Sequence, residues 1–149
     1  MDALLLRSIA APHVIDMKAF ADFRAGLLRH IAMEEKVLLP EACRRNGKPL
    51  SVAKQLRADH AALASLMVPT PTHEIVALIH DILEDHNPLE EGPGGMYHLC
   101  ERLAETELEA LFARVEATPD VSLKPHFDGP GVHENITRLL RARTLRKKG

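Results

Sequence analysis

Aromatic residues are scarce in this chain and tryptophan is absent: phenylalanine and tyrosine together make up 3% of the 149 residues. β-Sheets favour aromatic and β-branched side chains, so a core made mainly of leucine, isoleucine, valine, alanine and methionine is more typical of packed helices. Only two cysteines are present, Cys43 and Cys100, and they form no recognisable pattern. We therefore expect no disulfide framework and a reducing, cytoplasmic location.

Long apolar runs and a strong charge imbalance are also missing. No apolar stretch of ~18 residues occurs, so no membrane-spanning helix is expected. The N-terminal segment, which has an early acid at Asp2, does not resemble a secretory signal. The formal net charge of −2 does not indicate a nucleic-acid or anionic-membrane partner. Because a Ser-His-Asp signature, a glycine-rich phosphate loop and a CxxC pair are all lacking, the corresponding enzyme classes have no support in the sequence.

Proline and glycine clusters divide the chain into helical segments. The apolar periodicity between these breaks predicts helices at about 16–45, 51–67, 72–91 and 96–117, with a short last helix near 132–146. Because the connections are short, we predict an all-α fold in which the first four helices form an up-down-up-down bundle. The chain is thus interpreted as one domain, 1–149, with a core bundle at about 16–117, a short N-terminal segment and a C-terminal extension at 118–149.

Nine histidines are the unusual feature of the composition. The apolar stripes of the first three predicted helices carry ionisable residues where apolar ones are expected: His30, Glu34, His60, His86 and Glu90. In each His-Glu pair the two residues are four apart, so their side chains share one face of a helix. A second acid follows each pair, so the motif HxxxEE occurs twice, at 30–35 and 86–91.

These core-facing polar residues predict a bound cation. A carboxylate in a bundle core is costly unless it is paired or ligates a metal. Imidazole and carboxylate ligands suit iron, manganese or zinc, and His-Glu motifs that project inward from bundle helices can build a di-metal site. A lone HxxxE is usually a surface pair, but two copies in phase with the core favour a metal site. We expect the other histidines at the surface: His13, His73, His80, His98, His126 and His133.

The stretches 28–40, 59–60 and 86–91 resemble the hemerythrin-like, or HHE cation-binding, domain family, and the resemblance covers roughly residues 20–100. It implies a four-helix bundle around a non-haem di-iron centre. The members of the family bind or sense O₂, handle NO or oxidative stress, or regulate iron. By resemblance, the expected ligands are His30 on one iron, His60 and His86 on the other, and Glu34 and Glu90 bridging them, with Glu91 as an alternative to Glu90.

The chain departs from this family at two places. The family has a further histidine on a helix before the first ligand helix, but only about 15 residues precede that helix here. His13 would lie ~25 Å from His30 along a helix, too far to replace it. A second family histidine would fall at Ala64. Pro88, which is followed by Gly92 to Gly95, is expected to kink its helix and end it early. The site is therefore expected to be ligand-poor or to hold a single metal.

We expect the helix at 96–117 to take the place of the family's first helix, which this chain lacks. It would run antiparallel to the helix before it and bring Tyr97 or Glu101 to the level of His86 and Glu90, as an extra ligand. The first fifteen residues are expected to be too few to reach that level.

Three functional hypotheses follow. The first is an iron-binding protein that binds or senses a small ligand such as O₂, NO or peroxide, and that is not a classical enzyme. The second is a metal-dependent enzyme, either oxidase- or peroxidase-like or a zinc hydrolase. The third is a metal-free helical interaction module. Its basic C-terminal tail is expected to be a solvated helix end and not a docking site.

Overall fold

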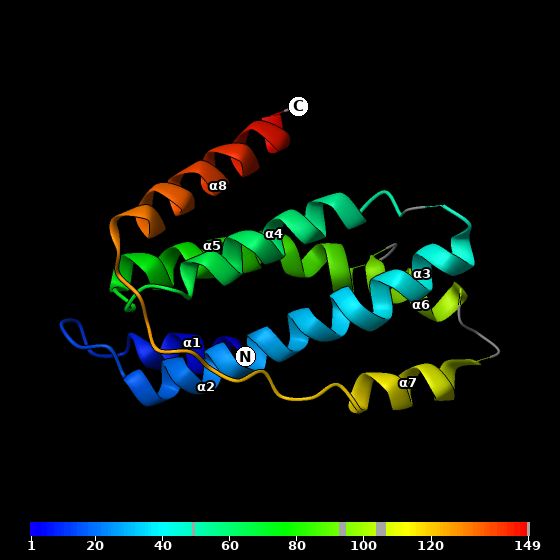
Figure 1. The fold of residues 1–149 in the computed structure, drawn as a ribbon, viewed down its shortest axis with the longest axis horizontal. Coiled ribbons are helices and arrows are strands. Elements are labelled where there is room, and N and C mark those ends of the chain that lie inside the picture. The colour runs from blue at the N-terminus through cyan, green and yellow to red at the C-terminus, as the bar shows by residue number, and fades with distance from the viewer. Residues whose placement is uncertain (49, 93–94, 104–106, 149) are drawn as a thin grey trace.

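The structure, a computed structural model, describes the backbone of residues 1–48, 50–92, 95–103 and 107–148, and their side chains except those of 101–103, 146 and 147. The described residues form an all-α protein without a β-strand (Figure 1). In chain order its elements are α1 (Asp2–Ser8), α2 (Met17–Met33), the π-helical segment η1 (Glu34–Leu38), α3 (Leu39–Asn46), α4 (Ala53–Leu66), α5 (His73–Glu91), α6 (Met96–Leu103), α7 (Leu108–Glu116) and α8 (Pro130–Lys148). Among the described residues, no helix has both the length and the apolar character needed to cross a bilayer.

Local signals explain where the long helices begin and end. Asp16 caps α2 by accepting a hydrogen bond from the backbone N–H of Ala19, and Thr72 caps α5 in the same way through Ile75. Helix α5 therefore begins within one residue of the predicted start at 72. Helix α3 ends at Gly47, whose φ of 73° lies in the left-handed region that glycine adopts without steric cost.

Two predicted segments differ in the structure. The predicted helix at 96–117 consists of two helices: α6 packs against α3 and α5, whereas α7 packs against η1. The prediction of one continuous helix there is therefore wrong. The short helix α1 was not expected, and it packs against α2 and α5 because the side chain of Leu5 is fully buried in the core.

Proline affects two of the helices that carry the expected ligands. Pro40 has no N–H to donate to the carbonyl of Lys36, and just before it the helix widens into η1, where Leu39 donates to the carbonyl of Glu34, five residues back. Helix α5 contains Pro88 and continues to Glu91, where the sequence predicts its end. It ends at Gly92, where an added Cβ would lie 2.6 Å from the carbonyl oxygen of Pro88.

Two apolar clusters form the core. One joins α1, α2, α4, α5 and the buried Ile136 of α8, and the other joins η1, α3, α4, α6 and α7. On α4, Leu56 belongs to the second cluster and Leu63 to the first, so His60 lies between the two. The expected metal ligands therefore occupy a polar layer between two apolar layers.

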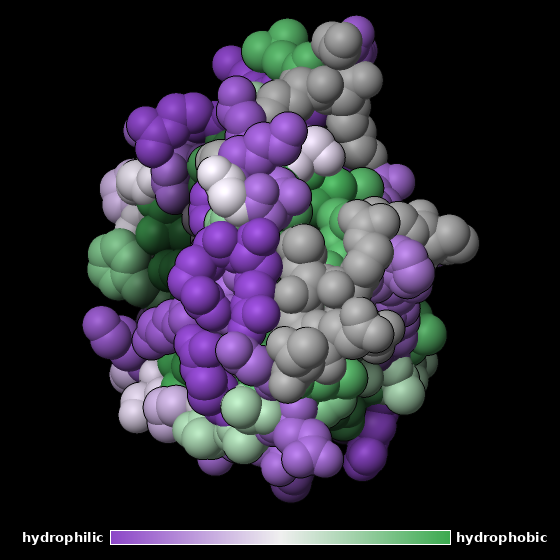
Figure 2. Space-filling view, turned by 90° about the vertical axis from the view of Figure 1, so that its right-hand side faces the viewer, coloured by the Kyte–Doolittle hydropathy of each residue, from purple (hydrophilic) through white to green (hydrophobic). Residues whose placement is uncertain are grey.

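The segment after α7 crosses the outside of α2 before the chain enters α8 (Figure 1). The Arg29 guanidinium donates to the carbonyl of Thr118, and the Arg24 guanidinium donates to that of Lys124. Viewed from the end of the molecule where α3 terminates, hydrophilic side chains form much of the described surface (Figure 2).

Candidate metal centre

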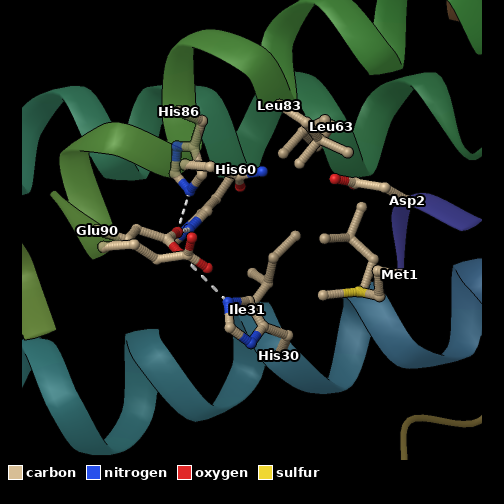
Figure 3. Close-up of a pocket in the computed structure, with 12 residues that line it drawn as sticks. Met1, Asp2, His30, Ile31, His60, Leu63, Leu83, His86 and Glu90 are labelled. Atoms are coloured by element: carbon tan, nitrogen blue, oxygen red, sulfur yellow. Dashed lines mark hydrogen bonds and ion pairs between the residues drawn. The ribbon is translucent and has the colours of Figure 1, made fainter.

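Four buried side chains converge between η1, α4 and α5. Glu34, His60, His86 and Glu90 each offer one ligand atom, and these atoms all lie within 4.8 Å of one another. The His30, His60, His86 and Glu90 side chains point toward a common centre (Figure 3). The sequence periodicity places all of these residues on core-facing stripes, and the structure brings them together.

Each of the two carboxylates has its oxygens turned in different directions. Glu34 places Oε2 2.9 Å from His60 Nε2 and Oε1 2.5 Å from His30 Nε2. Glu90 places Oε1 against His86 Nε2 and 3.7 Å from His60 Nε2, whereas its Oε2 lies 3.3 Å from His30 Nε2. Both carboxylates therefore lie between one side that carries His60 and His86 and another side that carries His30.

Helix α6 completes the side of His30. The Tyr97 hydroxyl donates to Glu34 Oε1 at 2.7 Å, and it also lies 3.3 Å from Glu90 Oε2 and 3.0 Å from His30 Nε2. The prediction that Tyr97 faces the site is therefore confirmed. Its role as a metal ligand stays a prediction, and the side chain of Glu101, the other expected ligand on this helix, lies outside the described residues.

Three buried polar atoms of the cluster lack a well-directed hydrogen bond. They are Glu34 Oε2, Glu90 Oε1 and His60 Nε2, which lie close to a ring nitrogen or a carboxylate oxygen of the cluster without hydrogen-bond geometry. Buried polar atoms are nearly always hydrogen-bonded, so unsatisfied ones that face a common point need an explanation. A cation at that point would coordinate all three, and the donor set of imidazole nitrogen and carboxylate oxygen therefore fits a metal ion.

The far ring nitrogens of two histidines contact a second set of carboxylates. His60 Nδ1 lies 2.7 Å from Glu35 Oε1, and His86 Nδ1 lies 3.1 Å from Asp59 Oδ2. A carboxylate on the outer nitrogen holds the proton there and leaves Nε2 free to bind a metal. The sequence reasoning assigns no role to Glu35 or Asp59, although both lie in the motifs quoted above: Glu35 is the second acid of HxxxEE and Asp59 precedes His60.

Protons balance the carboxylates when no cation is present. Burial lowers the pKa of His30 and of His60, but the contacts with Glu34 and Glu90 outweigh it and raise the two values to about 9 and about 10. Burial raises the pKa of Glu90, but its contacts with His30, His60 and His86 lower it well below the usual range. Two carboxylates that lie close together without a cation are expected to have raised pKa values. For Glu90 this expectation is wrong, because the three imidazoles around it lower its pKa.

A small cavity of about 190 Å³ opens beside the cluster. Its polar wall includes the His30, His60, His86 and Glu90 side chains, and its apolar wall includes Leu27, Ile31, Leu63 and Leu83. Met1 and Asp2, at the N-terminal end of α1, also line the cavity (Figure 3). The expectation that the first fifteen residues are too few to reach His30 is therefore wrong, because α1 packs against α2.

The remaining expected residues lie outside the cluster. Glu91 is exposed at the edge of the cavity, and Ala64 is half-buried. His80 belongs to a separate group with the exposed Asp81 and Glu84. Within the described part of the chain, none of the six histidines expected at the surface belongs to the buried cluster. No family model, curated protein or solved structure matches the chain.

Proposed function

We propose that this chain is a hemerythrin-like, metal-binding four-helix bundle. The continuous segment α2–η1–α3 would form one of its helices, and α4, α5 and α6 the other three. The bundle would hold non-haem iron between these helices, and the bound iron would take a small exogenous ligand. We propose a ligand binder or sensor, with O₂, NO and peroxide as the candidate ligands.

The arrangement of the two carboxylates carries this proposal. Glu34 and Glu90 each have one oxygen on the side of His60 and the other on the side of His30. Carboxylates that bridge two metal ions need this orientation, and inward-facing glutamates and histidines on bundle helices build such sites. We therefore propose two iron positions, one beside His60 and His86 and the other beside His30 and Tyr97.

The ligand chemistry favours a metal of intermediate softness. The convergent atoms are imidazole nitrogens and carboxylate oxygens, which suit iron and also zinc or manganese. Glu35 and Asp59 contact the outer ring nitrogens of His60 and His86, respectively. These contacts support a bound metal, because they hold each ring with Nε2 toward the centre of the cluster. A metal-free interaction module would leave the buried Glu34 Oε2, Glu90 Oε1 and His60 Nε2 without a well-directed hydrogen bond.

The cavity supports a small exogenous ligand. Its volume of about 190 Å³ is below the ~300–1,000 Å³ that is usual for pockets that bind organic molecules. The apolar side chains of Leu27, Ile31, Leu63 and Leu83 would limit the access of water, and the hydrophobic shell around a metal tunes its reactivity. A ligand of two or a few atoms fits this space better than a larger substrate.

Metal analysis and visible spectroscopy test the proposal directly. Protein purified without chelator should carry about two iron ions per chain and absorb in the visible when iron is in the ferric state. Iron-loaded protein should also change its spectrum on addition of NO. A chain that takes up neither iron nor zinc nor manganese at micromolar concentration would contradict the proposal, and a colourless chain that retains zinc would reassign the metal.

A further inference from the structure

Helix α8 is attached to the rest of the molecule in two ways. Apolar side chains in its first two-thirds pack onto the core cluster of α2, α4 and α5: Val132, Ile136, Leu139 and Leu140. Further along the helix, Arg143 contacts α4 and α5 through hydrogen bonds. Figure 1 shows α8 on the outer side of the pair formed by α4 and α5.

Arg143 uses two of its guanidinium nitrogens. Its Nε donates to Asp59 Oδ1 of α4 at 3.1 Å, and its Nη2 donates to Asp85 Oδ2 of α5 at 3.0 Å. The Arg143 side chain is 11% exposed and that of Asp59 is 1% exposed, so water screens this ion pair little. A planar guanidinium that spans two carboxylates fixes the orientation of both.

The contact continues from Asp59 to a proposed metal ligand. Asp59 Oδ1 also accepts a hydrogen bond from Gln55 at 2.7 Å, whereas Asp59 Oδ2 faces His86 Nδ1 at 3.1 Å. The other ring nitrogen of His86, Nε2, contacts Glu90 in the cluster. A continuous line of buried polar contacts thus joins α8 to the centre of the molecule.

Among the described side chains, the corresponding contact on His60 leads to α4 and not to α8. Its outer carboxylate, Glu35, pairs with Arg57 of α4 at 3.5 Å, and the Arg57 side chain is 52% exposed. The apolar residues of α8 already provide a docking surface for the helix, and a buried ion pair is weak evidence for stability by itself. The buried Arg143–Asp59 pair therefore suggests a role beyond attaching the helix.

We propose that Arg143 is a positioning residue that couples the docking of α8 to metal binding at His86. Arg143 holds Asp59, and Asp59 holds the His86 ring with its proton on Nδ1 and its Nε2 toward the centre. A metal on Nε2 fixes the same arrangement from the other side. Coupling of this kind is reciprocal, so bound metal should hold α8 more tightly against α4 and α5. The inference rests on the proposed metal site and makes α8 the element that reports its occupancy.

The experiment uses Zn²⁺ as a redox-inert probe on the full chain. The dissociation constant is measured by competition with a chromophoric chelator for the wild type, Arg143→Gln, Arg143→Lys and Arg141→Gln. Arg141 is the matched control, because it is an exposed arginine of the same helix. We expect Arg143→Gln to weaken Zn²⁺ binding about tenfold or more, Arg143→Lys to restore part of the loss and Arg141→Gln to leave it unchanged.

Hydrogen exchange of the α8 amides provides a readout that does not depend on the affinity. Saturating Zn²⁺ should slow exchange in α8 by roughly the same tenfold factor in the wild type, and this protection should disappear in Arg143→Gln. The affinity loss should also disappear when Arg143→Gln is made in an Asp59→Asn background, because the effect passes through Asp59.

The outcomes separate this inference from the proposed function. A wild type that binds no Zn²⁺, iron or manganese contradicts the metal centre itself. A wild type that binds Zn²⁺ without any change in α8 exchange, together with an Arg143→Gln variant of unchanged affinity, overturns only the coupling. An equal affinity loss from Arg143→Gln in the wild-type and Asp59→Asn backgrounds would also overturn it, because the loss would then reflect general destabilisation.

Discussion

The hydroxyl of Tyr97 lies 2.7 Å from Oε1 of Glu34, although the two residues are 63 positions apart in the chain. Burial and the neighbouring carboxylates raise the pKa of the Tyr97 phenol. The hydroxyl therefore keeps its proton in the metal-free protein and donates a hydrogen bond to Glu34. A ferric ion at this point would compete with the proton for the Tyr97 oxygen. Whether Tyr97 binds the metal or only donates a hydrogen bond to Glu34 can therefore be tested.

The first prediction concerns Tyr97→Phe. We expect iron(III)-loaded wild type to show a phenolate-to-iron charge-transfer band in the visible, and the variant to lose the band while keeping its helical circular dichroism. Tyr97 is the single tyrosine of the chain, so no other residue can give a tyrosinate band. Iron(III)-loaded wild type without such a band would show that Tyr97 only donates a hydrogen bond to Glu34.

The second prediction compares two adjacent helix positions. Glu90→Gln should lower metal affinity strongly, by about 100-fold, because it removes a buried anionic ligand from the centre of the cluster. Glu91→Gln is the matched control: Glu91 carries the same side chain but is exposed. It should bind metal like the wild type within about twofold. Equal losses in the two variants, measured by titration with Zn²⁺, would contradict the assignment of Glu90.

The third prediction concerns the protons that metal binding releases. In the metal-free protein the pKa of His30 is raised to about 9 and that of His60 to about 10, so both imidazoles are protonated at neutral pH. A metal ion binds only the neutral imidazole, so binding at pH 7 should release roughly two protons. Proton release can be followed in weakly buffered solution with a pH indicator, and affinity should keep rising from pH 7 to pH 9. Binding that is independent of pH in this range would exclude His30 and His60 as ligands.

The fourth prediction concerns the stability of the metal-free protein. The folded-state pKa values of His30 and His60, about 9 and about 10, lie above the ordinary value of 6.5. Their contribution to stability is therefore complete below about pH 6.5 and is lost as the pH rises through 9 to 10. Metal-free protein should melt several degrees lower at pH 8 than at pH 6, since about 1 kcal/mol corresponds to ~2–4 °C for a domain of this size.

Added metal should counteract the loss of stability between pH 6 and pH 8. A metal that binds only the native state stabilises it by a few kcal/mol at ~100–1,000 times its dissociation constant, and its affinity increases with pH. Calorimetric scans at pH 6 and pH 8, with and without Zn²⁺, should therefore show a larger rise in melting temperature at pH 8. Equal melting temperatures with and without metal at both values would contradict a native-state site.

The sequence by itself determined which side chains face the core. The spacing of four between His30 and Glu34, and between His86 and Glu90, places each pair on one helix face, and the apolar stripes show that these faces point inward. Capping and breaking residues also located the ends of the long helices within a few positions. These features depend on interactions between residues close in the chain, so local rules were sufficient to find them.

Only the tertiary structure decided how these helix faces meet. The contact of Asp59 with His86 and Arg143 joins α4, α5 and α8, and no periodicity in one helix predicts which neighbour its side chain will touch. Adjacent residues in a helix point about 100° apart, but Glu34 and Glu35 contact opposite nitrogens of the His60 ring at the widened turn before Pro40. The packing of α1 against α2 and the separation of α6 from α7 were likewise not predicted from the sequence, because they depend on burial against distant segments. The sequence therefore specified which candidate ligands face the core, whereas packing decided their partners, their protonation and their connection to α8.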